Sequence, residues 1–305
     1  MSAGTVFTSS IANALKETLE TIVDDDTDGY EEKALLHQWL DELKMEDNYE
    51  DDLESGGPGL ASEKPEGTEI PLGSIREGYI TRYIARTFAL KLIITEEALE
   101  DRKYPKILNA ARRLKRAMWK TADIDATNIL VRMFNTAFVG GDSQPLGSAS
   151  HTLPHSGTFS NVMAVPMSPS RASVIIATSQ IAKYPGHDGV TEGYEPRIAV
   201  CPTEQWAVWE GLLGSRFAPE PGEFNEINVV NQTLDIRAVP NKYWNNTTTN
   251  WALLTNNDNA LNFRWRRRPR NRTWVDNDQE LMKYAISARW ARGWSDPRAI
   301  YCVEA

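Results

Sequence analysis

The sequence predicts an α+β fold, and three features carry that prediction. One long apolar stripe with helical spacing occupies the middle of the chain, at 107–137. A run rich in β-branched and aromatic residues, 78–95, precedes it, and several short strand-like runs follow it between 197 and 304. Because helices and strands do not alternate at the regular spacing of a doubly wound sheet, the class is α+β.

The central helix is the strongest local signal. Apolar residues from Ile107 to Ala137 recur in steps of three and four residues, which is the spacing of one face of an α-helix. No Gly or Pro interrupts 106–139, while Pro105 suits the first turn and Gly140 suits the stop. We therefore expect a helix over 106–139, ~50 Å long at about 1.5 Å per residue.

The run from Gly78 to Thr95 predicts one long strand or two consecutive strands. β-branched and aromatic side chains dominate it, and most apolar positions share one parity. Arg82 and Arg86 interrupt that apolar face. Fully extended, the run would reach ~53 Å at about 3.3 Å per residue, which is more than a strand inside one core needs. The strand is therefore expected to leave the main core and meet another surface.

Weaker signals define the remaining elements. Short amphipathic helices are expected at 10–22 and 31–43, and the Gly- and Pro-rich stretch 47–73 predicts a long extended loop. A helix capped by Ser168 is expected over 168–183. The other expected elements are a helix at 203–215 and strands at 197–200, 227–230, 234–240, 251–255, 261–265, 283–293 and 299–304.

The composition excludes several classes of protein. With 41% hydrophobic and 25% charged residues among 305, the chain resembles a globular protein and not a disordered one. No run reaches the ~20 apolar residues of a membrane span, and no secretion signal opens the chain, so a soluble protein without membrane partners is expected. Two cysteines, Cys201 and Cys302, cannot build a disulfide framework, which is typical of proteins from a reducing compartment.

The charge is distributed unevenly along the chain. Residues 1–67 hold eighteen Asp or Glu against four Lys, a net charge of −14, whereas the remainder carries +5 in a chain of net charge −9. Such an asymmetry is typical of an arm with a role different from that of the body, and a merely solvated leader is the alternative. The overall negative charge argues against a general nucleic-acid binder.

No constellation of residues predicts an enzyme. His151 and His155 have a helical i, i+4 spacing, but Pro154 breaks the helix that would place both rings on one side of a metal ion. Ser148, His151 and Asp142 could form a nucleophile, a base and an orienting acid on paper, yet no Gly-x-Ser-x-Gly turn supports them. No phosphate-binding glycine loop is present either. We therefore expect no catalytic residue, no metal site and no cofactor.

The most unusual motif places six arginines within nine residues, next to two tryptophans. They are Arg264, Arg266, Arg267, Arg268, Arg270 and Arg272. Three roles are open: contact with nucleic acid, a solvated loop, and pairing with carboxylates of an adjacent copy. We favour the intersubunit role, because the N-terminal segment supplies complementary carboxylates. The predicted contact set comprises these six arginines together with Arg82, Arg86, Asp24, Asp25, Asp26, Asp51, Asp52 and Glu54.

The order of motifs resembles the major capsid protein of tailed bacteriophages, a family with the Hong Kong 97 fold. Glu63–Gly67 and Ile94–Glu97 resemble that family's extended loop and its return into the spine helix. Asn135–Phe138, followed by Asp142, Pro145, Leu146, Ser150 and His151, is similar to the family signature after this helix. Ser143 and Gly147 depart from the residues usual at their positions.

The second half of the chain extends this resemblance. Glu195–Val200, with Pro202 and Trp206, is similar to the strand and helix that enter the family's axial domain. Further matches are Asn228–Asn231, Trp251–Leu254, Ala288–Arg289, Gly293 and Asp296–Arg298.

The resemblance implies a Hong Kong 97-like α+β architecture in five parts. These are an acidic N-terminal arm at 1–45, an extended loop at 46–95, a peripheral domain with the spine helix at 96–159, an axial domain at 160–282, and C-terminal strands at 283–305 that return to the peripheral and axial domains. The extended loop would lie over the next subunit, and the acidic arm would contact a neighbour.

The resemblance also implies a function. The chain would be the major head protein, which self-assembles into hexamers and pentamers of an icosahedral shell around packaged double-stranded DNA. Its place would be the virion, after assembly in the host cytoplasm. The implied partners are other copies, a portal protein and, in some relatives, scaffolding or decoration proteins, with DNA held by non-specific contact only.

Two other functions remain as alternatives. An encapsulin-like nanocompartment shell shares the fold but encloses enzymes, so its contents would distinguish it from a capsid. An arginine-patch nucleic-acid-binding protein would use the 264–272 run and would sediment as a monomer.

Overall fold

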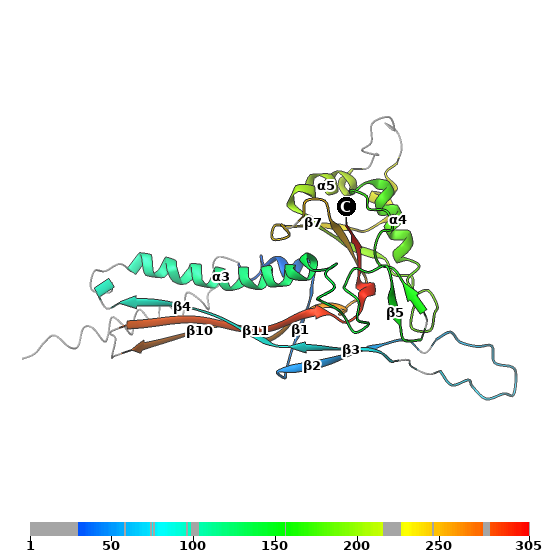
Figure 1. Ribbon diagram of the computed structural model, residues 1–305, viewed down its shortest axis with the longest axis horizontal. Coiled ribbons are helices and arrows are strands. Elements are labelled where there is room, and N and C mark those ends of the chain that lie inside the picture. The colour runs from blue at the N-terminus through cyan, green and yellow to red at the C-terminus, as the bar shows by residue number, and fades with distance from the viewer. Residues whose placement is uncertain are drawn as a thin grey trace, which may run out of the picture.

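The computed structural model describes residues 30–57, 59–73, 75, 77–95, 97–98, 104–155, 157–215, 227–245, 247–276 and 281–304. The helix expected at 10–22 lies outside these residues. Helices and strands are mixed, and the strands form four separate sheets, which confirms the α+β class. The described chain has an elongated arm, a more compact body and a projecting hairpin (Figure 1).

The elongated arm is one long helix lying along a four-stranded sheet (Figure 1). The helix is α3, Tyr104–Val131, and the strands in sheet order are β1, Asp41–Lys44; β10, Leu261–Asp276; β11, Leu281–Trp294; and β4, Arg86–Thr95. β1 runs parallel to β10, and the other neighbours pair antiparallel. The sheet therefore joins segments from both ends of the chain.

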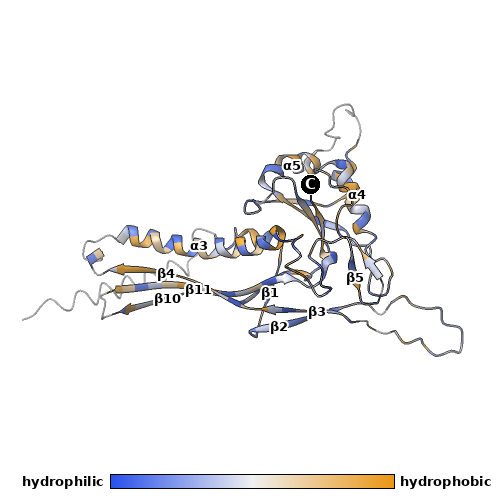
Figure 2. Ribbon diagram, in the orientation of Figure 1, coloured by the Kyte–Doolittle hydropathy of each residue, from blue (hydrophilic) through white to orange (hydrophobic). Residues whose placement is uncertain are grey.

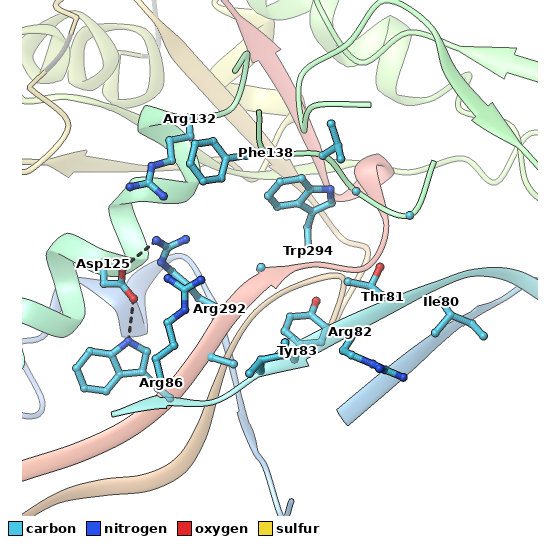
Figure 3. Close-up of a pocket in the computed structure, with 17 residues that line it drawn as sticks. Ile80, Thr81, Arg82, Tyr83, Arg86, Asp125, Arg132, Phe138, Arg292 and Trp294 are labelled. Atoms are coloured by element: carbon cyan, nitrogen blue, oxygen red, sulfur yellow. Dashed lines mark hydrogen bonds and ion pairs between the residues drawn. The ribbon is translucent and has the colours of Figure 1, made fainter. Parts of the chain in front are cut away.

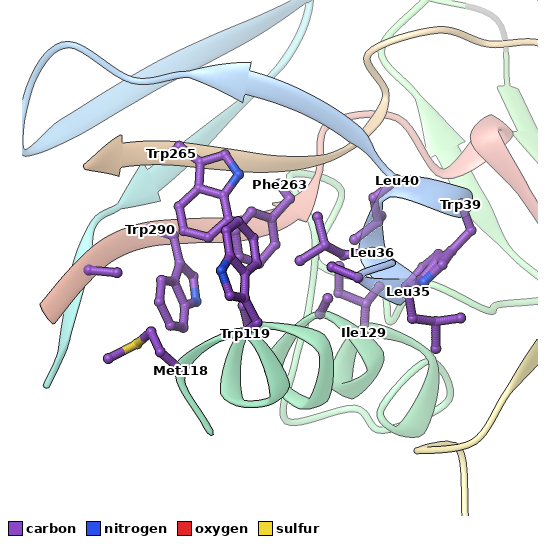
Figure 4. Packing of buried hydrophobic residues seen from close by; sticks show 14 of the residues in the cluster. Leu35, Leu36, Trp39, Leu40, Met118, Trp119, Ile129, Phe263, Trp265 and Trp290 are labelled. Carbon is purple, nitrogen blue, oxygen red and sulfur yellow. The ribbon is translucent and has the colours of Figure 1, made fainter. Parts of the chain in front are cut away.

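Tryptophans fill the core between this helix and the sheet (Figure 4). Trp119 of α3 and Trp265 of β10 meet edge to face with their ring centroids 5.4 Å apart, and Trp290 of β11 lies 5.5 Å from Trp265. Phe88 of β4 stacks on Trp290 at 4.0 Å. Aromatic pairs of this kind add about 0.5–1.5 kcal/mol beyond their burial, so they hold all the long elements together.

The predicted central helix is confirmed, but it ends at Val131 and not at 139. Beyond that point the amides of Met133 and Asn135 each donate to the carbonyl three residues earlier, so the chain continues as tight turns. The Met133 carbonyl accepts a hydrogen bond from Gly147, a loop residue, at 2.7 Å. The apolar spacing continues past the helix, and this long-range bond decides where the helix stops.

The helix expected over 31–43 is wrong. A short 3-10 helix, η1 at Leu35–Gln38, is followed by strand β1. The backbone amide of Leu36 donates to Asp123 Oδ1 of α3 at 3.0 Å, while Leu36 and Trp39 are buried in the arm's core. Tertiary packing against α3 and pairing with β10 thus override the local helical spacing.

The compact body contains the second four-stranded sheet, and hydrophobic residues fill its interior (Figure 2). Its strands in sheet order are β12, Ile300–Val303; β9, Trp251–Thr255; β7, Pro196–Pro202; and β8, Arg237–Asn241. Its helical segments are α4, Arg171–Ile181; η2, Thr203–Gln205; α5, Trp206–Gly214; α6, Val229–Thr233; and η3, Pro297–Ala299. Trp209, Trp251 and Tyr301 are fully buried at its centre.

Three expectations for the body and the adjoining strands need correction. The strand at 227–230 is wrong, because the Asn228 side chain accepts a hydrogen bond from Val230 N and starts helix α6 there. The residue that caps α4 is Ser170, which accepts from Ser173 N, and not Ser168. The strand expected at 261–265 continues to 276 as β10, so the arginine run is a strand.

The projecting hairpin consists of strands β2, Tyr49–Ser55, and β3, Glu77–Ile84, paired antiparallel. The long strand predicted at 78–95 is confirmed as two consecutive strands, β3 and β4, separated at Ala85. The stretch 47–73 is not loop throughout, because β2 occupies its first part. Residues 59–73 are all exposed and extend away from the rest of the molecule (Figure 1).

One smaller hairpin completes the fold beside the body, formed by β5, His151–Leu153, and β6, Gly157–Phe159. Among the helices that the structure describes, none is long and apolar enough to cross a membrane.

Candidate assembly surfaces

A buried ion cluster fixes the neck of the projecting hairpin to the body. Glu54, near the end of β2, accepts from Arg298 Nη2 at 2.5 Å and lies 2.9 Å from His187 Nε2. Arg298 also donates from Nε to both carboxylate oxygens of Asp296 at 2.9 Å. Burial alone would lower the pKa of Arg298, but the two carboxylates reverse that effect and raise it. Arg298 therefore remains charged in its buried site.

Two glycines allow the hairpin neck to approach His187 closely. A Cβ atom on Gly56 would lie 2.6 Å from the His187 Cβ, and one on Gly78 would lie 2.8 Å from His187 Cε1 and from Glu54 Cβ. Contacts this short do not occur between real side chains. Both strands of the neck are therefore packed against the body without room for a side chain.

The tip of the hairpin is the opposite of its neck. Its large apolar side chains lie in solvent, with exposed fractions of 78% for Leu60, 76% for Ile70, 98% for Leu72 and 70% for Ile75. Exposed apolar side chains gathered on one segment are typical of a surface that binds a partner. Because the loop extends away from its own body, that partner surface must lie outside this copy.

The structure pairs several of the predicted contact residues within one chain. Arg82 forms a two-pronged ion pair with Asp51 across the hairpin, at 2.6 and 2.7 Å. Arg264 contacts Asp52 and lies 3.3 Å from Glu50, with its guanidinium 4.0 Å from the centroid of the Tyr83 ring. These bonds attach the base of the hairpin to β10.

Arg268 is also satisfied by carboxylates of its own chain. Its guanidinium contacts Glu31 at 2.7 Å and Glu42 at 3.2 Å. Glu42 additionally accepts from Trp265 Nε1 at 2.7 Å, and a hydrogen bond from Glu42 raises the pKa of His37. The pairing therefore connects the first described residues to the arm's sheet.

A row of arginines on the outer part of β10 has no such compensation. Arg266, Arg270 and Arg272 are exposed and have no ion-pair partner within the described part of the chain. Arg267, whose Nη2 donates to Ser287 Oγ at 3.0 Å, lies among them. Burial lowers the pKa of Arg267, and so does repulsion from Arg266, Arg270, Arg272 and Arg289. Positive charge is thus concentrated here. Asp24, Asp25 and Asp26 lie outside the described residues.

A second group of arginines lines a cavity of about 400 Å³ at the junction of the arm and the hairpin (Figure 3). Arg86, Arg132 and Arg292 line it together with one carboxylate, Asp125, which lies 2.8 Å from Arg292. Exposed apolar side chains share the wall, among them Ile80, Ile84, Phe138 and Val139. The cavity therefore suits a segment that carries both carboxylate and apolar side chains.

The one arrangement that resembles a catalytic triad is a buried lock. His151 Nδ1 lies 2.5 Å from Asp142 Oδ2, as in a triad. Its Nε2 lies 3.2 Å from the carbonyl oxygen of Leu146 and from Asn161 Oδ1, however, whereas the Ser148 hydroxyl donates to Gln144. Since the imidazole is fully buried and does not contact the hydroxyl, this group holds the loop after α3 in place. Within the described residues no cluster of metal-ligating side chains occurs.

Sequence analysis missed the buried cluster of Glu54, His187, Asp296 and Arg298. Glu54 was expected at an intersubunit contact, and the other three belong to loops distant in sequence. No local signal marks such a cluster, because it arises only when the hairpin and the body come together.

Comparison with solved structures shows the fold. A chain from Microbacterium phage Oxtober96 superimposes with a TM-score of 0.53 at 10% identity, covering 88% of this chain and 90% of that chain. A chain from the capsid of an empty GTA particle gives 0.51 at 15% identity, covering 88% of both chains. A virus-like particle from Pyrococcus furiosus gives 0.52 at 11% identity, covering 94% and 98%. These likenesses confirm the Hong Kong 97-like fold.

The comparison of sequences identifies the family. No curated protein sequence shows a significant match. The family model described as phage capsid protein, however, matches residues 78–303, which include both four-stranded sheets except β1. Proteins of this family are structural parts of a capsid and not enzymes. Because the match covers well over half of the sequence, this chain belongs to the phage capsid protein family.

Proposed function

We propose that the protein is the major head protein of a tailed bacteriophage, and that its copies form hexamers and pentamers of an icosahedral shell. The observation that carries this proposal is the hairpin, whose neck is fixed to the body while its apolar tip lies in solvent. A monomer gains nothing from such a tip. In a shell, each tip covers an adjacent copy, and many such contacts acting together stabilise the particle.

The cavity at the arm–hairpin junction provides a surface for this contact. Its unpaired Arg86 and its apolar wall complement the tip, which carries Glu63, Glu66 and Glu69 beside Ile70 and Leu72. Carboxylate–arginine pairs fix the register of an interface, and apolar burial supplies most of its affinity. We propose that Arg86 contacts an adjacent copy here, as the sequence predicted.

The other expectations remain part of this proposal. The division into an N-terminal arm, extended loop, peripheral domain, axial domain and C-terminal strands at 1–45, 46–95, 96–159, 160–282 and 283–305 stays a prediction, although β10 shares a sheet with β4 and β11. Double-stranded DNA inside the shell, a portal protein, scaffolding or decoration proteins and assembly in the host cytoplasm are likewise proposed.

The test is electron microscopy of the expressed protein and of one deletion variant. Replacing 59–73 by a short glycine linker removes the tip but keeps β2 and the ion cluster at the neck. We expect closed particles from the parent chain, and from the variant a folded protein of unchanged helical content that forms none. Closed particles of normal size from the deletion variant would contradict the proposal.

A nanocompartment shell is the second candidate, supported by the likeness to the virus-like particle from Pyrococcus furiosus. The contents of particles recovered from the native source separate the two functions. Nuclease-protected double-stranded DNA supports the head protein, whereas an enclosed enzyme without DNA supports the nanocompartment.

A further inference from the structure

The arginine row on β10 lies beside the point where the described chain begins. Arg268, in the middle of the row, binds Glu31, and Tyr30 lies under Arg116 of α3 with 4.3 Å between guanidinium and ring centroid. The segment preceding Tyr30 must therefore leave from the immediate surroundings of the row. That segment carries four aspartates in five residues, Asp24, Asp25, Asp26 and Asp28.

The arginines present their charge on an open side of the sheet. Arg270 and Arg272 pair with Ser287 and Ala285 of β11, positions that alternate with the buried residues facing α3. Arg270 and Arg272 therefore lie on the sheet face opposite the helix. β1 pairs with β10 only as far as Trp265, so within the described chain the edge of β10 beyond that residue is unpaired.

The distances match the length of the chain. Asp28 is three residues from Glu31 and Asp24 is seven, which gives a reach of at most about 10 and 24 Å at roughly 3.5 Å per residue. Arg272 lies four residues from Arg268, or ~13 Å along a strand at about 3.3 Å per residue. Every arginine of the row is thus within reach of an aspartate of the same chain.

We propose that the acidic run 24–28 lies over the row formed by Arg266, Arg270 and Arg272 of its own chain and neutralises it. Tethering within a few residues gives the run an effective concentration in the millimolar range at this surface, so the contact forms before any second copy arrives. The run thereby blocks an otherwise open polycationic face from nucleic acid and other polyanions. This assignment differs from the intersubunit role predicted from the sequence, and it does not depend on the proposed function.

Chemical crosslinking tests which copy supplies the aspartates. Full-length protein carrying Asp26→Cys and Arg270→Cys is treated with a short bis-maleimide and analysed on a denaturing gel. The native Cys201 and Cys302 are buried, and burial raises the pKa of Cys201 to about 12, so these thiols react little. The control pair combines Asp26→Cys with Thr248→Cys, an exposed position in the compact body.

We expect crosslinked protein of monomer size, with residues 26 and 270 joined in peptide mapping, at several times the yield of the control pair. Crosslinks found only in dimers, which a mixture of the two single-cysteine chains would also give, would overturn the proposal in favour of an intersubunit contact. A monomer yield equal to that of the control pair would also overturn it. Both readouts are independent of whether shells form.

DNA binding tests the consequence. Asp24, Asp25, Asp26 and Asp28 are all changed to Asn, and binding to a 20-base-pair duplex of mixed sequence is measured against salt. Exposing three arginines should steepen the slope of log Kobs against log salt by about 2–3, and adding Arg266→Gln, Arg270→Gln and Arg272→Gln should abolish the gain. The control changes Glu63, Glu66, Glu69 and Glu77 to Gln, an equal change in net charge. An equal gain in the control, or none in the aspartate variant, would refute the proposal.

Discussion

The two ends of the β2–β3 hairpin are built on opposite principles. At the neck, Glu54, His187 and Arg298 are buried and bonded to one another, and Gly56 and Gly78 allow contact without side chains. At the tip, residues 59–73 are exposed throughout. The neck is therefore ordered by the copy to which it belongs, whereas the apolar tip gains its burial only from another copy.

This difference separates stability from assembly. A buried charge is costly unless it is paired, so a substitution at the neck acts on the folding of the single chain. A side chain already in solvent contributes little to that folding, so a substitution at the tip acts on association. The following predictions are ordered by the expected loss of folding stability.

Arg298→Met should cause the largest loss. It leaves two buried carboxylates, Glu54 and Asp296, without their cation, and removing one partner of a buried pair costs about 3–5 kcal/mol. The free energy of unfolding in urea measures it. Arg197→Met is the control, because Arg197 and its partner Asp258 are both exposed. If Arg298→Met does not fold, Glu54→Gln provides the milder test. A loss no greater than that of the control would contradict the role of the cluster.

Gly78→Ala should cost less, about 1–3 kcal/mol, because the new Cβ overpacks a filled site. Gly57→Ala is the matched control, since nothing lies within 4 Å of a Cβ built there. Thermal unfolding of both variants measures the difference between them. Equal melting temperatures would show that the neck does not pack closely on His187.

Arg82→Gln should have a smaller effect than either neck substitution. The pair with Asp51 is exposed, although Arg82 holds the pKa of the Asp51 carboxyl below its usual value. Any loss of thermal stability at low ionic strength should vanish in 1 M NaCl, where the Debye length is about 3 Å. A loss that persists in 1 M NaCl would mean that Arg82 acts through packing and not through its charge.

Leu72→Ser should leave the folding of the single chain unchanged within about 0.5 kcal/mol, because the side chain is 98% exposed. The same variant should reduce the yield of closed particles in electron micrographs, while Leu72→Met should retain it. Normal particle yield from Leu72→Ser would break the assignment of the tip to an intersubunit contact.

Local sequence patterns predicted the elements whose side chains alternate regularly. The stripe from Ile107 to Met133 lies on α3, and the apolar run after Gly78 forms β3 and β4. The patterns failed where distant contacts decide. Val229 and Val230 favour a strand, but the Asn228 amide donates to Leu212 O at 2.6 Å and its oxygen caps helix α6.

The candidate surfaces were predictable in kind but not in partnership. The sequence showed that arginines and carboxylates are complementary, yet it did not show that Arg264 and Arg268 reach Asp52 and Glu31 of the same chain. Those pairs depend on β1 and the hairpin lying against β10. A charge count has no information about such distances, which explains why the predicted intersubunit set mixes residues satisfied within the chain with exposed ones.

Hydrogen exchange of residues 59–73, measured in separated subunits and in assembled particles, tests the central claim most directly. If the tip is ordered only by an adjacent copy, its amides exchange at nearly unprotected rates in the separated subunit and slow markedly in the particle. Strong protection in the separated subunit, or equally fast exchange in both states, would show that the tip is not an intersubunit contact.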